Sequence, residues 1–184
     1  MKPRARGVTV VEMLAVLALL AVLALLAAPG MAEMLRAYRL NAAVTDLHGA
    51  IDLARSEAMA RGRRVLLVPL EPGGRMWQHG WVVFVDENSD RRPSPGEEVI
   101  TSQGPLHEGM VVTARFTSNA SPQYVAYGPS GRSCSASNSM SARWGTFLLK
   151  QDGEIRRIII NMLGRVRSCG TGGPGNACEE SEDG

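Results

Sequence analysis

The hydrophobic pattern divides the chain into one unbroken apolar run, one amphipathic stretch and a series of short apolar runs. Residues 13–28 are all apolar, which makes 16 consecutive positions. Beyond them, apolar residues recur at intervals of three and four, as one face of an α-helix requires: Leu40, Val44, Leu47, Ile51, Ala54 and Ala58. Arg61 and Gly62 are typical of the last turn and the end of a helix. The pattern predicts an amphipathic helix over residues 31–62, continuous with the apolar run before it.

After Gly62 the pattern changes to short runs separated by Gly, Pro, Asn and Asp, as expected of strands. Asp152 and Gly153, between the last two runs, predict a two-residue hairpin turn. A helix followed only by strands indicates an α+β fold with an antiparallel sheet, not alternating β-α-β units. The expected strands are Val65 to Leu70, Trp81 to Val85, Glu98 to Thr101, Val111 to Phe116, Gln123 to Tyr127, Trp144 to Gln151 and Glu154 to Asn161.

Composition and charge narrow the class of protein. The chain has 184 residues, 45% hydrophobic and 21% charged, which suits one domain with an appended segment. A formal net charge of +2 excludes a globally basic protein. The charge is uneven, because three cations lie in the first seven residues and four acidic side chains lie in the last six. Between Arg132 and Arg167, seven cations stand against two acidic residues, so the region before the acidic end is basic.

The first thirty residues allow more than one interpretation. Residues 8–28 are just long enough for one membrane span, and the cations before them put the N-terminus in the cytoplasm by the positive-inside rule. An uncleaved anchor fits this pattern, and so does a secretory signal peptide cut near Gly30-Met31-Ala32. Neither explains Glu12, because an ionisable side chain in an apolar segment is costly and usually has a function.

The segment Gly7-Val8-Thr9-Val10-Val11-Glu12 resembles the cleavage motif of type IV prepilins and pseudopilins. The resemblance implies that prepilin peptidase removes residues 1–7 by cutting between Gly7 and Val8. It also implies that Val8 becomes the N-methylated first residue and that Glu12 is the carboxylate used in filament assembly. An N-terminal ammonium and a carboxylate on packed neighbours neutralise each other in an apolar medium. Val8 departs from the family pattern, which usually has Phe at that position.

Three further motifs are similar to the GspH/FimT branch of this class: Leu53-Ala54-Arg55-Ser56-Glu57-Ala58, Gly80-Trp81-Val82-Val83-Phe84-Val85-Asp86 and Gly164-Arg165-Val166-Arg167. The resemblance implies a type IV pilin-like fold, with a long N-terminal helix packed on an antiparallel β head. The transmembrane and filament-core half of the helix is expected over residues 8–30, the amphipathic half over 31–62, the head over 63–168 and a Gly-rich, acidic tail over 169–184.

The resemblance also implies a location and partners. It predicts a single-pass inner-membrane protein with its head in the periplasm, which later enters a pilus or pseudopilus filament. The expected partners are other pilins or pseudopilins, the inner-membrane assembly platform and prepilin peptidase.

The basic region near the C-terminus is the main candidate for a functional surface. Arg165 and Arg167 are two residues apart, so their side chains point the same way in an extended segment, and each guanidinium can engage a phosphate. In the FimT branch, the motif that starts at Gly164 is associated with DNA capture during natural transformation, which makes double-stranded DNA an expected partner. The competing interpretation is a hairpin whose arginines pair with the acidic tail. Further candidates on the neighbouring hairpin are Arg156, Arg157, Lys150 and Arg143.

The sequence therefore predicts a minor pilin at or near the tip of a type IV pilus that binds DNA for uptake. The alternative is a minor pseudopilin of type II secretion, which acts in protein export without binding DNA. A third possibility is a secreted enzyme released after Ala32. The sequence carries no nucleophile elbow, P-loop or zinc-protease motif, so no enzymatic activity and no cofactor are expected.

Three cysteines would face an oxidising compartment outside the cytoplasm. A disulfide between Cys169 and Cys178 would close a short Gly-rich loop and is the simpler expectation. The alternative pairs Cys134 with Cys169, which would join the segment before the last hairpin to the segment after it.

The loop after residue 85 has the ligand spacing of a calcium-binding loop. Asp86, Asn88 and Asp90 occupy positions 1, 3 and 5, and Glu97 occupies position 12. Arg91, however, stands where such loops carry a glycine, two prolines follow it, and no flanking helices are expected. The sequence favours a plain acidic hairpin loop and predicts no metal site.

Overall fold

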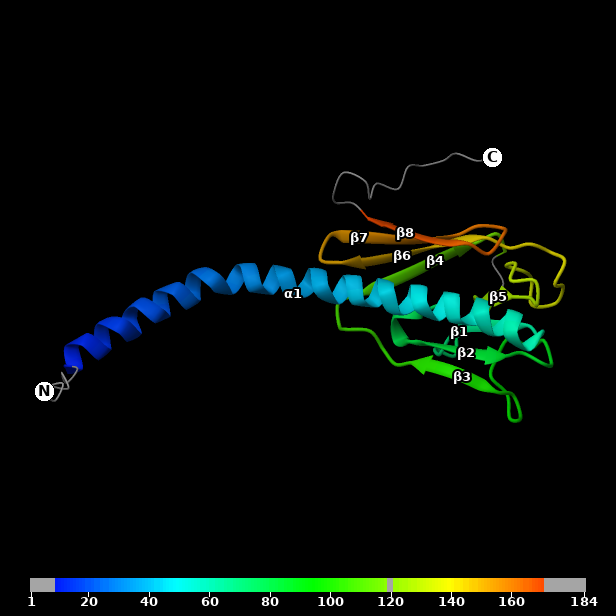
Figure 1. The fold of residues 1–184 in the computed structure, drawn as a ribbon, viewed down its shortest axis with the longest axis horizontal. Helices are drawn as coiled ribbons and strands as arrows, with labels where there is room; N and C mark the ends of the chain where they lie inside the picture. Colours follow the sequence, from blue (N-terminus) through cyan, green and yellow to red (C-terminus); the bar gives the residue numbers. More distant parts are fainter. Residues whose placement is uncertain (1–8, 119–120, 171–184) are drawn as a thin grey trace, which may run out of the picture. The chain divides into compact units, whose positions relative to one another are not determined.

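The computed structural model describes residues 9–118 and 121–170. A single helix, α1 (Val10–Arg61), comes first and a short 3-10 helix, η1 (Trp77–His79), follows the first strand. The α+β fold is confirmed, since all strand pairs are antiparallel (Figure 1). The strands are β1 (Val65–Pro69), β2 (Trp81–Val85), β3 (Val99–Gln103), β4 (Val111–Phe116), β5 (Val125–Tyr127), β6 (Gly145–Gln151), β7 (Glu154–Ile160) and β8 (Val166–Gly170).

The chain divides into two compact units after Tyr38. In the first unit, α1 carries exposed apolar side chains from Val10 to Leu26. Sequence analysis predicts a membrane span over residues 8–30, whereas no helix in the described part of the chain is both long and apolar enough to cross a membrane.

The second unit packs the end of α1 against two four-stranded sheets, in the orders β3-β2-β1-β5 and β4-β6-β7-β8. Figure 1 shows this part of α1 running alongside both sheets. The core joins the helix to inward residues of both sheets, such as Val83 of β2 and Phe147 of β6. The predicted helix face is confirmed, because all of its members except the half-buried Val44 are buried: Leu40, Leu47, Ile51, Ala54 and Ala58.

Three strands of the first sheet, β1, β2 and β5, are buried on both faces, which explains the continuous apolar runs in their sequence. Every residue of β1, β2 and β5 is buried. The core with α1 lies on one face. On the other face, Leu66 and Phe84 pack with Tyr124, Cys134 and Ala136, so a second apolar layer replaces solvent there.

The second sheet buries only the face that meets α1, and its strands alternate accordingly. Along β6, Phe147 and Leu149 are buried, whereas Lys150 is exposed. The predicted hairpin turn between β6 and β7 is confirmed, because Asp152 and Gly153 have φ angles of 47° and 92°. Two successive left-handed residues are what a two-residue turn of this type requires.

Strand β8 is absent from the sequence prediction. It pairs with β7 along its whole length and ends at Gly170, two residues inside the region predicted as a tail. The turn before it is set by a side chain, since Asn161 Oδ1 accepts from the N–H groups of Leu163 (3.0 Å) and Arg165 (2.9 Å). That turn brings the segment Val166–Gly170 back alongside β7, and the backbone hydrogen bonds between the two strands hold it in place. The amino-acid composition of this segment does not by itself indicate a strand.

Cys134 is buried with a free thiol, whose pKa is raised by burial. The alternative pairing of Cys134 with Cys169 is therefore wrong. The physical reason is position, because Cys134 packs on the first sheet whereas Cys169 belongs to β8 of the second sheet. Cys178 lies outside the described residues, so the pairing of Cys169 with Cys178 stays a prediction.

Candidate nucleic-acid interface

Gly164 closes the turn that leads from β7 into β8. Its φ angle is 78°, and its N–H donates to the carbonyl of Asn161 (2.9 Å). Its own carbonyl accepts from the Tyr127 hydroxyl (3.1 Å) and from Nη1 of Arg55 (3.2 Å), which ties the turn to β5 and α1. Burial raises the pKa of Tyr127, so this hydroxyl stays protonated and donates. Gly164 itself is buried, so it positions the arginines after it and presents no surface of its own.

Arg165 and Arg167 are exposed at the edge of the second sheet. The N–H of Asn161 donates to the Arg165 carbonyl (3.1 Å), so the pairing of β7 with β8 continues one residue pair beyond the strands. Val166, between the two arginines, packs against the core. Because side chains alternate along extended backbone, both arginines lie on the face turned away from α1.

Strand register aligns three cations across three neighbouring strands. Arg157 of β7 lies opposite Leu148 of β6 and opposite Cys169 of β8. Lys150 of β6 lies opposite Ile155, two residues before Arg157, and Arg167 of β8 lies opposite Ile159, two residues after Arg157. Diagonal neighbours of this kind are about 7–8 Å apart. Lys150, Arg157 and Arg167 therefore form a continuous diagonal line on the outer face of the sheet.

Arg115 joins the same face and was not predicted. One row across the four strands consists of Arg115, Thr146, Ile159 and Arg167, each lying opposite the next. The alternation within Val111–Phe116 is a sequence signal that Arg115 points away from the core. Its placement beside the C-terminal hairpin depends on the pairing of β4 with β6, which no local pattern encodes.

We call the outward surface of this sheet the basic face; it consists of Arg115, Lys150, Arg157, Arg165 and Arg167. Among the outward positions of the four described strands there is no acidic and no aromatic side chain. Within the described ranges, Lys150 and Arg157 also form no ion pair with an acidic side chain. The arrangement can bring several guanidinium and ammonium groups to a polyanion at once.

Arg156 is not part of the basic face. It shares the inward side of β7 with Ile158, which is buried. Its guanidinium forms an ion pair with Glu154 (3.2 Å), and its Nε donates to the side-chain oxygen of Asn41 in α1 (3.3 Å). The sequence prediction of Arg156 as a DNA contact therefore conflicts with its position, because its donors are used within the head.

Arg143 is likewise removed from the basic face, since it is only 5% exposed. Its guanidinium carbon lies 3.9 Å from the centre of the Tyr124 ring, and its Nη2 donates to the carbonyl of Ser118 (3.3 Å). A cation stacked on an aromatic ring and hydrogen-bonded to backbone stabilises the head. The sequence prediction that Arg143 extends a DNA track is not met by this geometry.

The predicted processing site, Gly7 and Val8, lies outside the described residues. Glu12 is described, and its carboxylate accepts from the N–H of Thr9 (3.1 Å), while Thr9 Oγ1 accepts from the N–H of Glu12 (3.3 Å). This reciprocal pair is a capping box, which satisfies two free donors at the start of α1. In the single chain, Glu12 therefore has a local partner at the helix N-terminus.

Comparisons with known proteins agree with these features. A family model described as type II transport protein GspH matches residues 43–164, and a model of the prokaryotic N-terminal methylation motif matches residues 2–28. The pilin-like protein PilA1 of Thermus thermophilus is 32% identical over 169 residues, which cover 88% of this chain and 97% of that protein.

Two solved structures share the fold. The type IV minor pilin FimU of Pseudomonas aeruginosa superposes with a TM-score of 0.52 at 19% identity, covering 70% of this chain and 90% of that one. The minor pseudopilin EpsH from the type 2 secretion system of Vibrio cholerae gives a TM-score of 0.52 at 13% identity, covering 73% and 99%. At these identities the likeness concerns the fold alone.

Proposed function

The chain belongs to the GspH family of minor pilins and pseudopilins, and on this premise we propose that it is a type IV pilus minor pilin that binds double-stranded DNA for uptake. The basic face is the proposed binding surface, at or near the tip of the filament. The family consists of structural filament subunits, and the proposal assigns the chain no catalytic role.

The diagonal line of Lys150, Arg157 and Arg167 is the observation that carries the proposal. Cations at about 7–8 Å intervals on one rigid sheet can follow a row of phosphates, each guanidinium taking a bidentate contact. Arg165 lies just before the start of β8, two residues from Arg167 and on the same face. Phosphate contacts carry no sequence information, so the expected binding is independent of base sequence.

Double-stranded DNA suits the basic face better than single strands do. Binding of single strands relies on aromatic side chains on which bases stack, and the outward positions of β4, β6, β7 and β8 contain none. Phosphate contact, in contrast, needs only the cations that are present.

Replacement of Arg157, Arg165 and Arg167 together by alanine should weaken DNA binding and reduce its salt dependence. Each lost phosphate contact lowers the slope of log affinity against log salt concentration by about 0.9, so the slope should fall by about 3. The measurement is a fluorescence-anisotropy titration of labelled double-stranded DNA with the full chain in detergent, at several salt concentrations.

Arg156→Ala is the matched control, because Arg156 neighbours Arg157 on β7 but lies on the inward side, with Glu154 and Asn41 as partners. It should leave the slope unchanged. An unaltered slope in the triple variant, or equal losses in both variants, would contradict the proposal.

A minor pseudopilin of type II secretion is the second candidate function, and the description of the matching family model favours it. In that case the head contacts sibling subunits or exported proteins, and the basic face has no nucleic-acid partner. The same titration separates the two functions, since a pseudopilin without a DNA role should show no salt-dependent binding.

We also propose that the chain is made as a precursor held in the inner membrane with its head in the periplasm. Prepilin peptidase would cut between Gly7 and Val8, and the product would be methylated at Val8. The methylation-motif match over residues 2–28 supports this proposal. Contacts with other pilins and with the assembly platform would then extract the subunit into the filament.

Gly7→Ala should block this processing, because the peptidase of this class requires the glycine before the cut. Mass spectrometry of the protein from cells should find residues 1–7 still attached. Val8→Ala is the control, since such peptidases tolerate that position, and it should be cut normally. A mature product of normal size from Gly7→Ala, or one that begins at Glu33, would refute the assignment.

Glu12 is proposed to act in assembly by accepting the N-terminal ammonium of a neighbouring subunit. The capping box with Thr9 holds its carboxylate at the start of α1, close in sequence to the proposed new N-terminus. A charge-assisted bond to an ammonium is stronger than a neutral one, so the ammonium would displace or share the Thr9 contact in an apolar filament core.

A further inference from the structure

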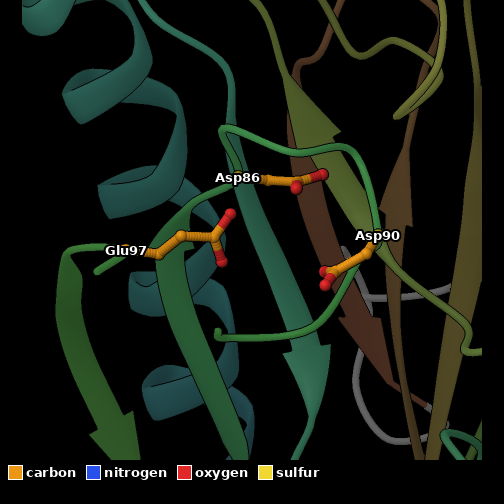
Figure 2. Close-up of side chains that lie close together, drawn as sticks. All are labelled: Asp86, Asp90 and Glu97. Atoms are coloured by element: carbon orange, nitrogen blue, oxygen red, sulfur yellow. The ribbon is translucent and has the colours of Figure 1, made fainter. Parts of the chain in front are cut away.

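The loop between β2 and β3 gathers three carboxylates that the proposed function does not use. Asp86 directly follows β2, Asp90 lies in the middle of the loop, and Glu97 comes two residues before β3. One carboxylate oxygen from each residue lies within 4.8 Å of those of the other two. Figure 2 shows the three side chains facing a common space inside the loop.

Hydrogen bonds from the loop backbone hold two of these carboxylates in place. Glu97 accepts from the N–H of Glu87 (2.9 Å) and, through its other oxygen, from the N–H of Ser94 (3.0 Å). Asp90 accepts from the N–H of Arg92 (2.8 Å). Asp90 also accepts from Nδ2 of Asn88 (2.9 Å) and from the Ser94 hydroxyl (2.7 Å), and Glu97 also accepts from the N–H of Asn88 (3.3 Å). A carboxylate offers about four acceptor positions, so each of these two groups keeps about one position for a ligand.

Asp86 differs from the other two because it is only 3% exposed. Its Oδ1 accepts from the N–H of Ser89 (2.8 Å), whereas its Oδ2 is buried and has no hydrogen-bond partner among the described residues. Burial raises the pKa of Asp86, although the charge of Arg64 lowers it. A buried carboxylate oxygen without a donor is unfavourable unless another group compensates it.

The neighbouring arginines donate to acceptors elsewhere, except that Nε of Arg64 is buried without a hydrogen-bond partner among the described residues. Arg64 donates to the Ser89 hydroxyl, and Nη2 of Arg92 donates to the Pro72 carbonyl (2.7 Å). Across the described residues, neither guanidinium forms an ion pair with any of the three carboxylates. The negative charge in the loop is therefore not neutralised by direct pairing.

We propose that Asp86, Asp90 and Glu97 bind one Ca²⁺ ion within the β2–β3 loop. Ca²⁺ takes oxygen ligands at about 2.3–2.6 Å, so oxygens on opposite sides of one ion lie about 5 Å apart. The 4.8 Å limit on the three oxygens fits this span. The ion would give the buried Oδ2 of Asp86 its missing partner and would join the end of β2 to the start of β3.

Arg91, one of the three features that disfavour calcium in the sequence, does not disfavour it in the structure. Arg91 has a φ angle of 64°, which is the left-handed conformation that a glycine supplies in such loops. Its guanidinium carbon lies 5.6 Å from the centre of the Tyr124 ring, in a cation–π contact. The turn is therefore made without the glycine.

Calorimetric titration of the chelator-treated full chain in detergent with CaCl₂ tests the site. The expected dissociation constant is about 10⁻⁴–10⁻³ M, as in extracellular calcium modules. At 10 mM Ca²⁺ (about 10–100 times that constant), the midpoint of thermal unfolding of the head should rise by roughly 5 °C. Asp86→Asn and Glu97→Gln should each weaken binding about 10-fold or more, because each removes one charged ligand.

Glu87→Gln is the matched control, since Glu87 lies in the same loop but pairs with Arg63. Its Ca²⁺ affinity should match that of the unaltered chain. Absence of a binding heat and of a shift in the unaltered chain would overturn the proposal. So would equal weakening in Glu87→Gln, or an equal shift with MgCl₂, which would indicate general screening of the acidic loop.

Discussion

Gly164→Ala should destabilise the head by about 2–5 kcal/mol and lower its unfolding midpoint by roughly 10 °C. Gly164 has a φ angle of 78°, and a left-handed backbone costs an L-residue about 1–2 kcal/mol. An added Cβ would also lie 2.6 Å from the Gly131 carbonyl oxygen and 3.0 Å from the Ser133 nitrogen. Because these are backbone atoms, they cannot move aside, and overpacking of this kind costs about 1–3 kcal/mol.

Gly153→Ala separates the two contributions. Gly153 also has a left-handed φ angle, of 92°, but nothing lies within 4 Å of the position that an added Cβ would take. It should therefore lose only the backbone contribution of about 1–2 kcal/mol. Urea unfolding of both variants, followed by the fluorescence of the buried Trp77 and Trp81, measures the difference. An equal decrease in the free energy of unfolding of the two variants would show that the close contacts around Gly164 do not contribute to the destabilisation.

The second large effect is expected for Trp77→Ala, at about 3–5 kcal/mol. Trp77 is fully buried, and its ring meets Phe147 edge-on at 4.8 Å and Phe116 at 6.5 Å between centres. Its Nε1 donates to Oε1 of Gln123 (3.0 Å). The substitution removes the indole from this aromatic group and leaves a cavity beside Phe116 of β4 and Phe147 of β6.

Trp144→Ala is the control for the loss of an indole, because Trp144 is 45% exposed. Its backbone makes its hydrogen bonds with Thr117, and these survive the substitution. It should change stability by no more than about 0.5 kcal/mol. Thermal unfolding, followed by fluorescence of Trp81, compares the two variants. A comparable loss in Trp144→Ala would mean that stability is not concentrated in the Trp77 cluster.

Local pattern was sufficient where one face of an element is apolar and the other is polar. The helix face from Leu40 to Ala58 could be predicted because spacings of three and four place apolar residues on one side. Strands β2 and β4 have the predicted bounds, since β-branched residues fill them and turn-forming residues flank them. The Asp152-Gly153 turn followed from the left-handed conformations that these residues accept.

The local pattern was insufficient where it did not show which of two neighbouring residues in a strand faces the core. In β7, Arg156 and Arg157 must point to opposite faces, but the three isoleucines after them fit either assignment. Only the packing of Ile158 and Ile160 into the core decides that Arg157 is outward and Arg156 inward. The burial of Arg143 against Tyr124 could not be predicted for a different reason, because a cation in a polar segment is usually solvated.

Sequence alone was enough for the order of helix and strands, the buried side of α1, the hairpin between β6 and β7, and the family to which the motifs point. Three-dimensional packing was needed to show that β8 forms, that β4 lies beside β6 and adds Arg115 to the basic face, and that one oxygen of Asp86 is buried without a donor among the described residues. The physical reason is that periodicity reports which way a residue faces relative to its own neighbours in the chain. Which strand lies beside it, and whether water reaches it, depend on contacts between residues far apart in sequence.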